Sequence, residues 1–226
     1  MNAVISRILK TVGRAPRASL LLTFAAVVIH LSFSIRVQLL YDRTALGHHE
    51  LWRLLTCHWV HLSGDHLFWS AMTFLGLGFL CERMDRKRFY ATVAVSALLI
   101  PAVIWLGMPH LVIYGGLSGL DCALYALLMI LMIKREIQSR SWTWVALFAL
   151  LQGGLIAKIT YEIVTGLTIF VSNTHADMIP VPLAHLAGGV AGTAIGLLKD
   201  SVVVRKSMPQ MSKRHFYEKA TGHRDG

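Results

Sequence analysis

Six apolar stretches of membrane-spanning length divide this 226-residue chain, and they constrain its fold more than any other feature. A helix needs roughly 20 apolar residues to cross the hydrocarbon core of a bilayer. The expected spans are residues 18–39, 62–81, 89–108, 115–133, 142–165 and 182–198. Charged residues make up only 15% of the chain, against about 25% in a soluble domain. We therefore expect an all-α polytopic membrane protein with one six-helix bundle at 18–198.

The first stretch could instead be a cleaved signal peptide, because four basic residues precede its apolar run. No clear small-residue cleavage site follows Ser34, and five further spans come after it. Both observations favour an uncleaved first helix.

The positions of the basic residues predict the orientation. Eighteen of the 22 lysines and arginines lie in four clusters, at 1–17, 82–88, 134–140 and 199–226. The connections between these clusters carry few or none. Cytoplasmic loops of membrane proteins are enriched in lysine and arginine. Residues 1–17 and 199–226 are therefore expected to be basic cytoplasmic segments, with both termini inside.

Other classes of protein fit the sequence less well. The net charge of +10 comes from short clusters between apolar runs, which suits membrane topology better than nucleic-acid binding. Cys57, Cys81 and Cys122 are widely spaced and form no CxxC pair, so neither a disulfide framework nor a zinc knuckle is indicated. The P-loop and HExxH motifs are absent, which argues against a P-loop ATPase and a zincin-type metalloprotease.

Polar side chains gather where the even-numbered spans begin, on the outer side. Asp65 and His66 open the second span, Ser118 and Asp121 the fourth, and His185 the sixth. Ionisable groups inside membranes usually face the bundle interior and mark function. We therefore expect these three helices to bring their polar groups together in one site.

A serine near a histidine suggests nucleophilic catalysis, with His185 as the base that takes the proton of Ser118. The helices that carry them can pack closely, because glycines recur at 115, 116 and 119, and again at 188, 192 and 196. An oxyanion could be held by the Ser118 N–H at a helix start, by His66, or by Ser70 one turn later.

Each of these features also has a simpler explanation. A lone GxSG in a membrane helix is usually a packing motif. His58, His61, His66 and His185 could form a metal or haem site, although His61 and His66 lie five positions apart, a poor helical spacing for ligands. The joint pattern of Ser118 and His185 on glycine-rich helices is more specific, and it predicts a site without metal or other cofactor.

Three segments resemble the rhomboid intramembrane serine proteases: "HWVHLSGDHLFWS" (58–70), "GGLSGLD" (115–121) and "AHLAGGVAG" (184–192). The resemblance covers most of residues 18–198, and Trp52-Arg53 is similar to a Trp-Arg pair in the first rhomboid loop. It implies Ser118 as nucleophile, His185 as base and His66 as an oxyanion donor, with His61 in a supporting position.

Two positions depart from the rhomboid pattern. Ser70 stands where an asparagine is common, and Cys122 stands where an aromatic residue often packs on the histidine. A catalytically silent rhomboid-like protein, acting in binding or membrane-protein quality control, therefore remains an alternative. A haem or quinone carrier is a third class.

Three further polar residues stay without a settled role. Lys158 and Glu162 lie four residues apart on the fifth span, where they could shape the site or recognise a substrate terminus. We favour a neutralised structural pair that shares Asp121, because such pairing makes a buried charge tolerable. Asp121 could alternatively orient His185 as a triad acid, but rhomboids are described as using a Ser-His dyad.

The phrases "DHLFW", "GLSGLD" and "AKITYE" resemble the rhombosortase branch in particular. That resemblance implies a multi-pass protein of the bacterial inner membrane whose site opens to the periplasmic side. Its partners would be the lipid bilayer and a membrane-anchored protein substrate with a single transmembrane segment and a GlyGly-type C-terminal sorting tail.

Overall fold

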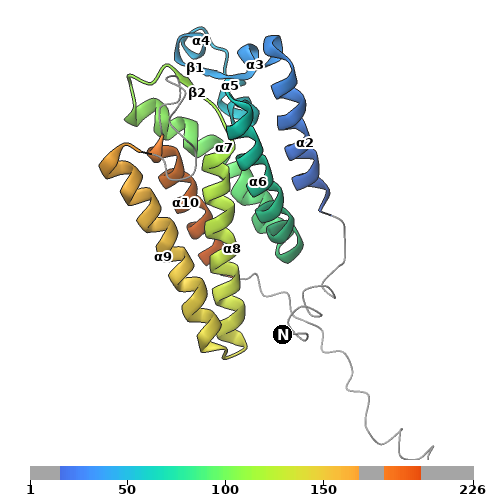
Figure 1. The fold of residues 1–226 in the computed structure, drawn as a ribbon, viewed down its shortest axis with the longest axis vertical. Helices are drawn as coiled ribbons and strands as arrows, with labels where there is room; N and C mark the ends of the chain where they lie inside the picture. Colours follow the sequence, from blue (N-terminus) through green and yellow to red (C-terminus); the bar gives the residue numbers. More distant parts are fainter. Residues whose placement is uncertain (1–15, 168–180, 200–226) are drawn as a thin grey trace, which may run out of the picture.

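A computed structural model of the protein describes residues 16–167 and 181–199, and it is mostly helical. The elements are α2 (Arg17–Leu31), α3 (Phe33–Leu39), β1 (Tyr41–Asp42), α4 (Arg43–Gly47), α5 (Arg53–Thr56), the 3-10 helix η1 (Cys57–Trp59), α6 (Gly64–Met84), α7 (Arg86–Gly107), β2 (Ile113–Tyr114), α8 (Ser118–Gln138), α9 (Trp142–Thr165) and α10 (Pro182–Leu197). The long helices lie side by side, and the short elements gather at one end of the bundle (Figure 1). The predicted cytoplasmic segments, 1–17 and 199–226, fall almost entirely outside the described residues.

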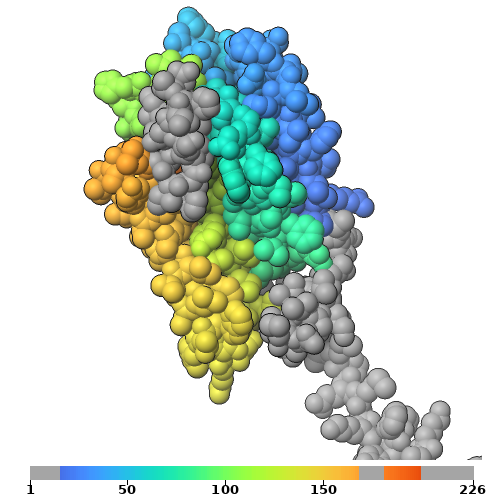
Figure 2. All heavy atoms as spheres, viewed as in Figure 1, coloured from blue at the N-terminus to red at the C-terminus, as the bar shows by residue number. Residues whose placement is uncertain are grey.

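Two of the described helices, α7 and α9, are long and apolar enough to cross a membrane. The bent pair α2 and α3 adds a third if it counts as one span, and α10 is a shorter apolar helix. These helices make the chain a membrane protein. Apolar side chains cover the outside of α2, α6 and α9, which form much of the face seen in Figure 2. The mostly helical architecture predicted from the sequence is confirmed, whereas the six spans and their orientation stay predictions.

The first predicted span, 18–39, is wrong as a single helix. α2 ends at Leu31, Ser32 is extended, and α3 leaves at an angle of 115°. Serine favours such breaks because its side chain competes with the helical backbone for hydrogen bonds. The turn is stabilised by the following loop. Arg53 donates to the carbonyl oxygens of Val37 and Leu40 at the end of α3.

α8 is the central helix of the bundle. It packs against α6, α7, α9 and α10, and its residues are buried almost continuously from Gly119 to Leu131. An apolar helix surrounded by other helices needs no polar face. The first residues of α8 therefore lie inside the protein, beneath the short elements (Figure 1).

α8 and α10 approach so closely that side chains are excluded between them. A methyl group added at Gly188 would collide with the carbonyl oxygen of Gly119, and one at Gly192 with that of Ala123. Small residues at four-residue intervals allow such contact between membrane helices. This seam brings the first turn of α10 beside the first turn of α8.

The segment before α6 is hydrogen-bonded to α7 at a carbonyl group that a proline leaves without a helical donor. Pro101 lies inside α7 and has no N–H, so the carbonyl oxygen of Ala97, four residues earlier, loses its helical donor. His58 Nε2 lies 3.0 Å from that oxygen. A carbonyl can only accept, so the His58 Nε2 carries the proton and donates it.

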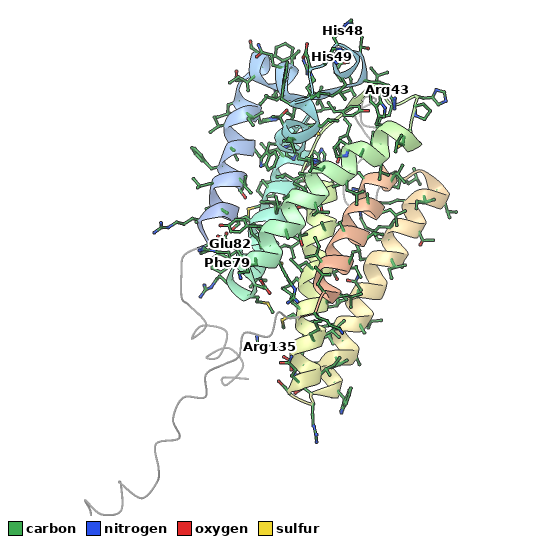
Figure 3. All side chains as sticks on the ribbon, turned by 180° about the vertical axis from the view of Figure 1, so that it is seen from behind. Arg43, His48, His49, Phe79, Glu82 and Arg135 are labelled. Atoms are coloured by element: carbon green, nitrogen blue, oxygen red, sulfur yellow. The ribbon has the colours of Figure 1, made fainter. Side chains whose placement is uncertain are left out.

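A second contact fastens α2 to α6. Glu82, near the end of α6, accepts hydrogen bonds from the backbone N–H groups of Ala18 and Ser19 and from the Ser19 hydroxyl. These groups belong to the first turn of α2, where backbone donors lack helical partners. Glu82 thus caps α2, and it lies towards the end of the bundle opposite Arg43 and His48 (Figure 3).

Candidate active site

Ser118 and His185 meet at the start of the α8–α10 seam. Ser118 is the first residue of α8 and His185 lies in the first turn of α10. Their Oγ and Nε2 atoms are 3.1 Å apart, within hydrogen-bonding distance. His185 is buried, with 7% of its surface exposed. A hydroxyl and an imidazole in this arrangement can exchange a proton.

The other ring nitrogen of His185 faces α9. His185 Nδ1 lies 2.7 Å from Glu162 Oε2, and Lys158 Nζ lies 2.9 Å from Glu162 Oε1. Lys158 Nζ is also 3.2 Å from His185 Nδ1. The carboxylate is 1% exposed, so its charge is balanced inside the protein by the lysine. Ser118, His185, Glu162 and Lys158 thus form one continuous polar cluster across three helices.

The residues just before Ser118 are hydrogen-bonded to the segment between α5 and α6. The Leu117 N–H donates to His61 Nε2 at 3.3 Å, and the Gly116 N–H donates to the carbonyl oxygen of Cys57 at 3.1 Å. Burial lowers the pKa of His61 to about 3, so its ring is neutral and Nε2 is free to accept. His61 therefore positions the backbone that leads into Ser118.

Gly116 is required by its backbone conformation and by its neighbour. Its φ angle is +121°, which residues with a Cβ rarely adopt. A methyl group there would also lie 2.8 Å from Cε1 of His66. The ring of His66 therefore rests directly on the Gly116 backbone, two residues before Ser118.

The predicted oxyanion donors come from α8 and α6. Its own N–H is at the N-terminus of α8, where it lacks a helical acceptor. His66 reaches the site from α6 and stacks edge-on with His61, with ring centroids 5.1 Å apart. Ser70 is buried one helical turn after His66. These groups can offer N–H and O–H donors.

Asp121 and Cys122 follow Ser118 within the next turn of α8. Within the described residues, no hydrogen bond or ion pair joins Asp121 to His185 or Lys158, and the buried Asp121 Oδ1 has no partner. Lys158 forms its direct ion pair with both carboxylate oxygens of Glu162, and its interaction with Asp121 is electrostatic, without a hydrogen bond. Cys122 packs instead against Leu155 and Ile159 of α9.

Two of the four histidines considered for a metal or haem site have backbone partners. His58 donates to Ala97, and His61 accepts from Leu117. Across 16–167 and 181–199, no three His, Cys, Asp or Glu side chains are grouped so that they could hold a metal ion.

Sequence reasoning named Glu162 but missed its contact with His185. A signal was available, since Glu162 lies three residues before the end of α9 and His185 three residues after the start of α10. The two residues therefore have matching depth in neighbouring helices. What the sequence could not supply was the rotation of α9 that turns Glu162 towards α10.

Comparison with curated proteins found no match. The Rhomboid domain family model matches residues 48–200, which include α6 to α10 and all the residues of the polar cluster. The match covers more than half of the chain, and the protein is therefore a member of the rhomboid family.

Proposed function

We propose that this protein is an intramembrane serine endopeptidase that cleaves a peptide bond in or near the transmembrane segment of a membrane-anchored substrate. Rhomboid-family proteins are typically intramembrane serine proteases. The observation that carries the proposal is the 3.1 Å distance between Ser118 Oγ and His185 Nε2.

The reaction begins when Ser118 Oγ attacks the scissile carbonyl carbon and His185 Nε2 takes the hydroxyl proton. The carbonyl oxygen becomes an oxyanion, held by the Ser118 N–H and His66, with help from Ser70. Collapse of this intermediate breaks the C–N bond, and His185 returns the proton to the leaving amine. Water, activated by His185 in the same way, then releases the acyl group from Ser118.

The substrate we propose is a protein with a single transmembrane segment and a C-terminal sorting tail of the GlyGly type. The similarity of "DHLFW", "GLSGLD" and "AKITYE" to rhombosortases supports this choice. It also supports a place in a bacterial inner membrane, with six spans, cytoplasmic termini and a site that opens to the periplasm.

Labelling with a fluorophosphonate tests the proposal, because the reagent reacts with activated serines. The full chain in lipid should be labelled and should cleave a reporter with a single transmembrane segment. Ser118→Ala and His185→Ala should abolish both signals, whereas the exposed controls Ser139→Ala and His48→Ala should keep them. Folded wild-type protein that is neither labelled nor active would instead support the alternative of a silent rhomboid-like binding protein, a reading motivated by Ser70 and Cys122.

A further inference from the structure

We propose that Glu162 is the positioning residue of this site, holding His185 in the one tautomer that can accept the proton of Ser118. This inference rests on the proposed protease function, since the tautomer matters for the reaction only if Ser118 attacks. It adds a third, membrane-embedded member to a Ser-His pair.

The distances favour one assignment of the imidazole proton. A carboxylate can only accept a hydrogen bond, so the 2.7 Å contact with Glu162 Oε2 requires the proton on Nδ1 of His185. The neutral ring then has no proton on Nε2. That nitrogen can accept the Ser118 hydroxyl proton across the 3.1 Å contact.

Lys158 could in principle select the opposite tautomer. Its ammonium group lies 3.2 Å from His185 Nδ1, and an ammonium can only donate. Donation from Lys158 would require a bare Nδ1 and would place the ring proton on Nε2, which would prevent Ser118 from losing its own. Glu162 prevents this arrangement. Its Oε1 and Oε2 atoms accept from Lys158 Nζ at 2.9 and 3.0 Å, and Oε2 makes a shorter contact with His185 Nδ1, from which it accepts the proton's hydrogen bond.

The surroundings of Glu162 suit this role. It is 1% exposed and lies one helical turn from Lys158 on α9. The other ionisable side chains near His185 come from α8 and α6. Asp121 makes no hydrogen bond to the ring, and the His66 ring lies against the Gly116 backbone. Glu162 is thus the carboxylate placed to orient His185.

The proton balance needs no transfer to Glu162. When Ser118 loses its proton to Nε2, the ring becomes an imidazolium while Nδ1–H continues to donate to Oε2. The carboxylate stabilises this positive charge until the proton passes to the leaving amine. Glu162 therefore acts through His185 and touches no reacting atom.

Glu162→Gln in the full chain tests the inference, because glutamine keeps the size of the side chain and removes the charge. In the best-studied serine protease, the equivalent change lowers kcat about 10⁴-fold. We expect a loss of kcat of at least about 10²-fold, with KM changed less than about twofold, because binding groups remain in place. Glu162→Asp should recover part of the loss. Glu136→Gln, on the far end of α8, is the matched control and should behave as wild type.

The outcomes separate the two proposals. If Glu162→Gln is labelled within about threefold of the wild-type rate while Ser118→Ala is not labelled, the positioning role is overturned and the protease stands. If the wild type is neither labelled nor active, the proposed function fails. The tautomer of His185 then remains as the test of whether Glu162 orients the ring.

The tautomer of His185 can be measured in the wild-type protein even if that protein has no activity. Nitrogen NMR of histidine-labelled protein in lipid distinguishes a protonated from a bare ring nitrogen, and His185→Gln identifies the signals of that residue among the 11 histidines. We expect His185 to carry its proton on Nδ1, and Glu162→Gln to shift it to Nε2. A wild-type ring with its proton on Nε2 would overturn the inference even if Glu162→Gln failed to fold.

Discussion

Two helix contacts in this bundle each contain a buried glutamate, a cation paired with it and closely packed glycines. They differ in the other groups that the glutamate binds. At the α2–α6 contact, Glu82 pairs with Arg86 at the start of α7, and Gly78 gives α2 room. At the α8–α9–α10 contact, Glu162 lies one turn from Lys158, and Gly188 and Gly192 give α8 and α10 room. The two glutamates are 3% and 1% exposed, so burial does not distinguish them.

Their remaining partners do distinguish them. Glu82 accepts from the backbone of α2 and from Ser19, groups that neither titrate near neutral pH nor react. Glu162 accepts from an imidazole whose far nitrogen faces a serine hydroxyl. A buried acid therefore indicates a reactive site only when the chain of contacts beyond it ends at a group that can take part in chemistry.

The largest effect should come from the glycine seam. Gly192→Leu would push side-chain atoms into the carbonyl oxygen of Ala123, so α8 and α10 would have to separate. We expect loss of cleavage and a sharply reduced yield of folded protein, measured by size-exclusion chromatography and circular dichroism. Gly153→Leu is the matched control, because a Cβ at Gly153 meets no atom within 4 Å. A stable, active Gly192→Leu protein would contradict the close approach of α8 and α10 at this glycine.

Removing the cation beside each glutamate should have unequal effects. Lys158→Met leaves the Glu162 charge without its counter-ion, and breaking such a pair costs about 3 kcal/mol of unfolding free energy. Arg86→Met should cost about 1 kcal/mol or less, because the Arg86 side chain is 34% exposed and Glu82 keeps its α2 donors. Denaturation in mixed detergent micelles measures both. Equal losses would show that the two ion pairs are equivalent.

The smallest effect on catalysis should be that of Glu82→Gln. The amide oxygen can still accept from α2, but the charge-assisted bonds are lost, which we expect to lower the unfolding free energy by about 1–2 kcal/mol. The kcat of the folded protein should stay unchanged, in contrast to Glu162→Gln. Activity per folded molecule, counted by fluorophosphonate labelling, is the measurement. A fall in kcat comparable to that of Glu162→Gln would erase the distinction between the two glutamates.

Hydropathy predicted the regular helices well. The expected span 142–165 coincides with α9, and 89–108 differs from α7 by only a few residues. α8 runs beyond its expected end at 133 to Gln138, since a helix can continue past the apolar region that hydropathy detects. The break at Ser32 was missed, because an apolar run looks the same whether its helix is straight or bent.

The site was predictable in part for a similar reason. Ser118 and His185 could be proposed as partners because each opens a glycine-rich helix at the same depth. The choice between Asp121 and Glu162 as the neighbour of His185 could not be made, because it depends on how α8 and α9 are rotated about their axes. Such rotation is set by packing across the whole bundle and leaves no local pattern.

The proline in α7 has a consequence for the order of assembly. The Ala97 oxygen is held in position for His58 only once the helix around Pro101 exists, and the two partners are 39 residues apart in the chain. Membrane helices insert first and pack afterwards. We therefore expect the loop that carries His58 and His61 to dock late, after α7 has formed, so that the backbone leading into Ser118 is among the last parts of the protein to become ordered.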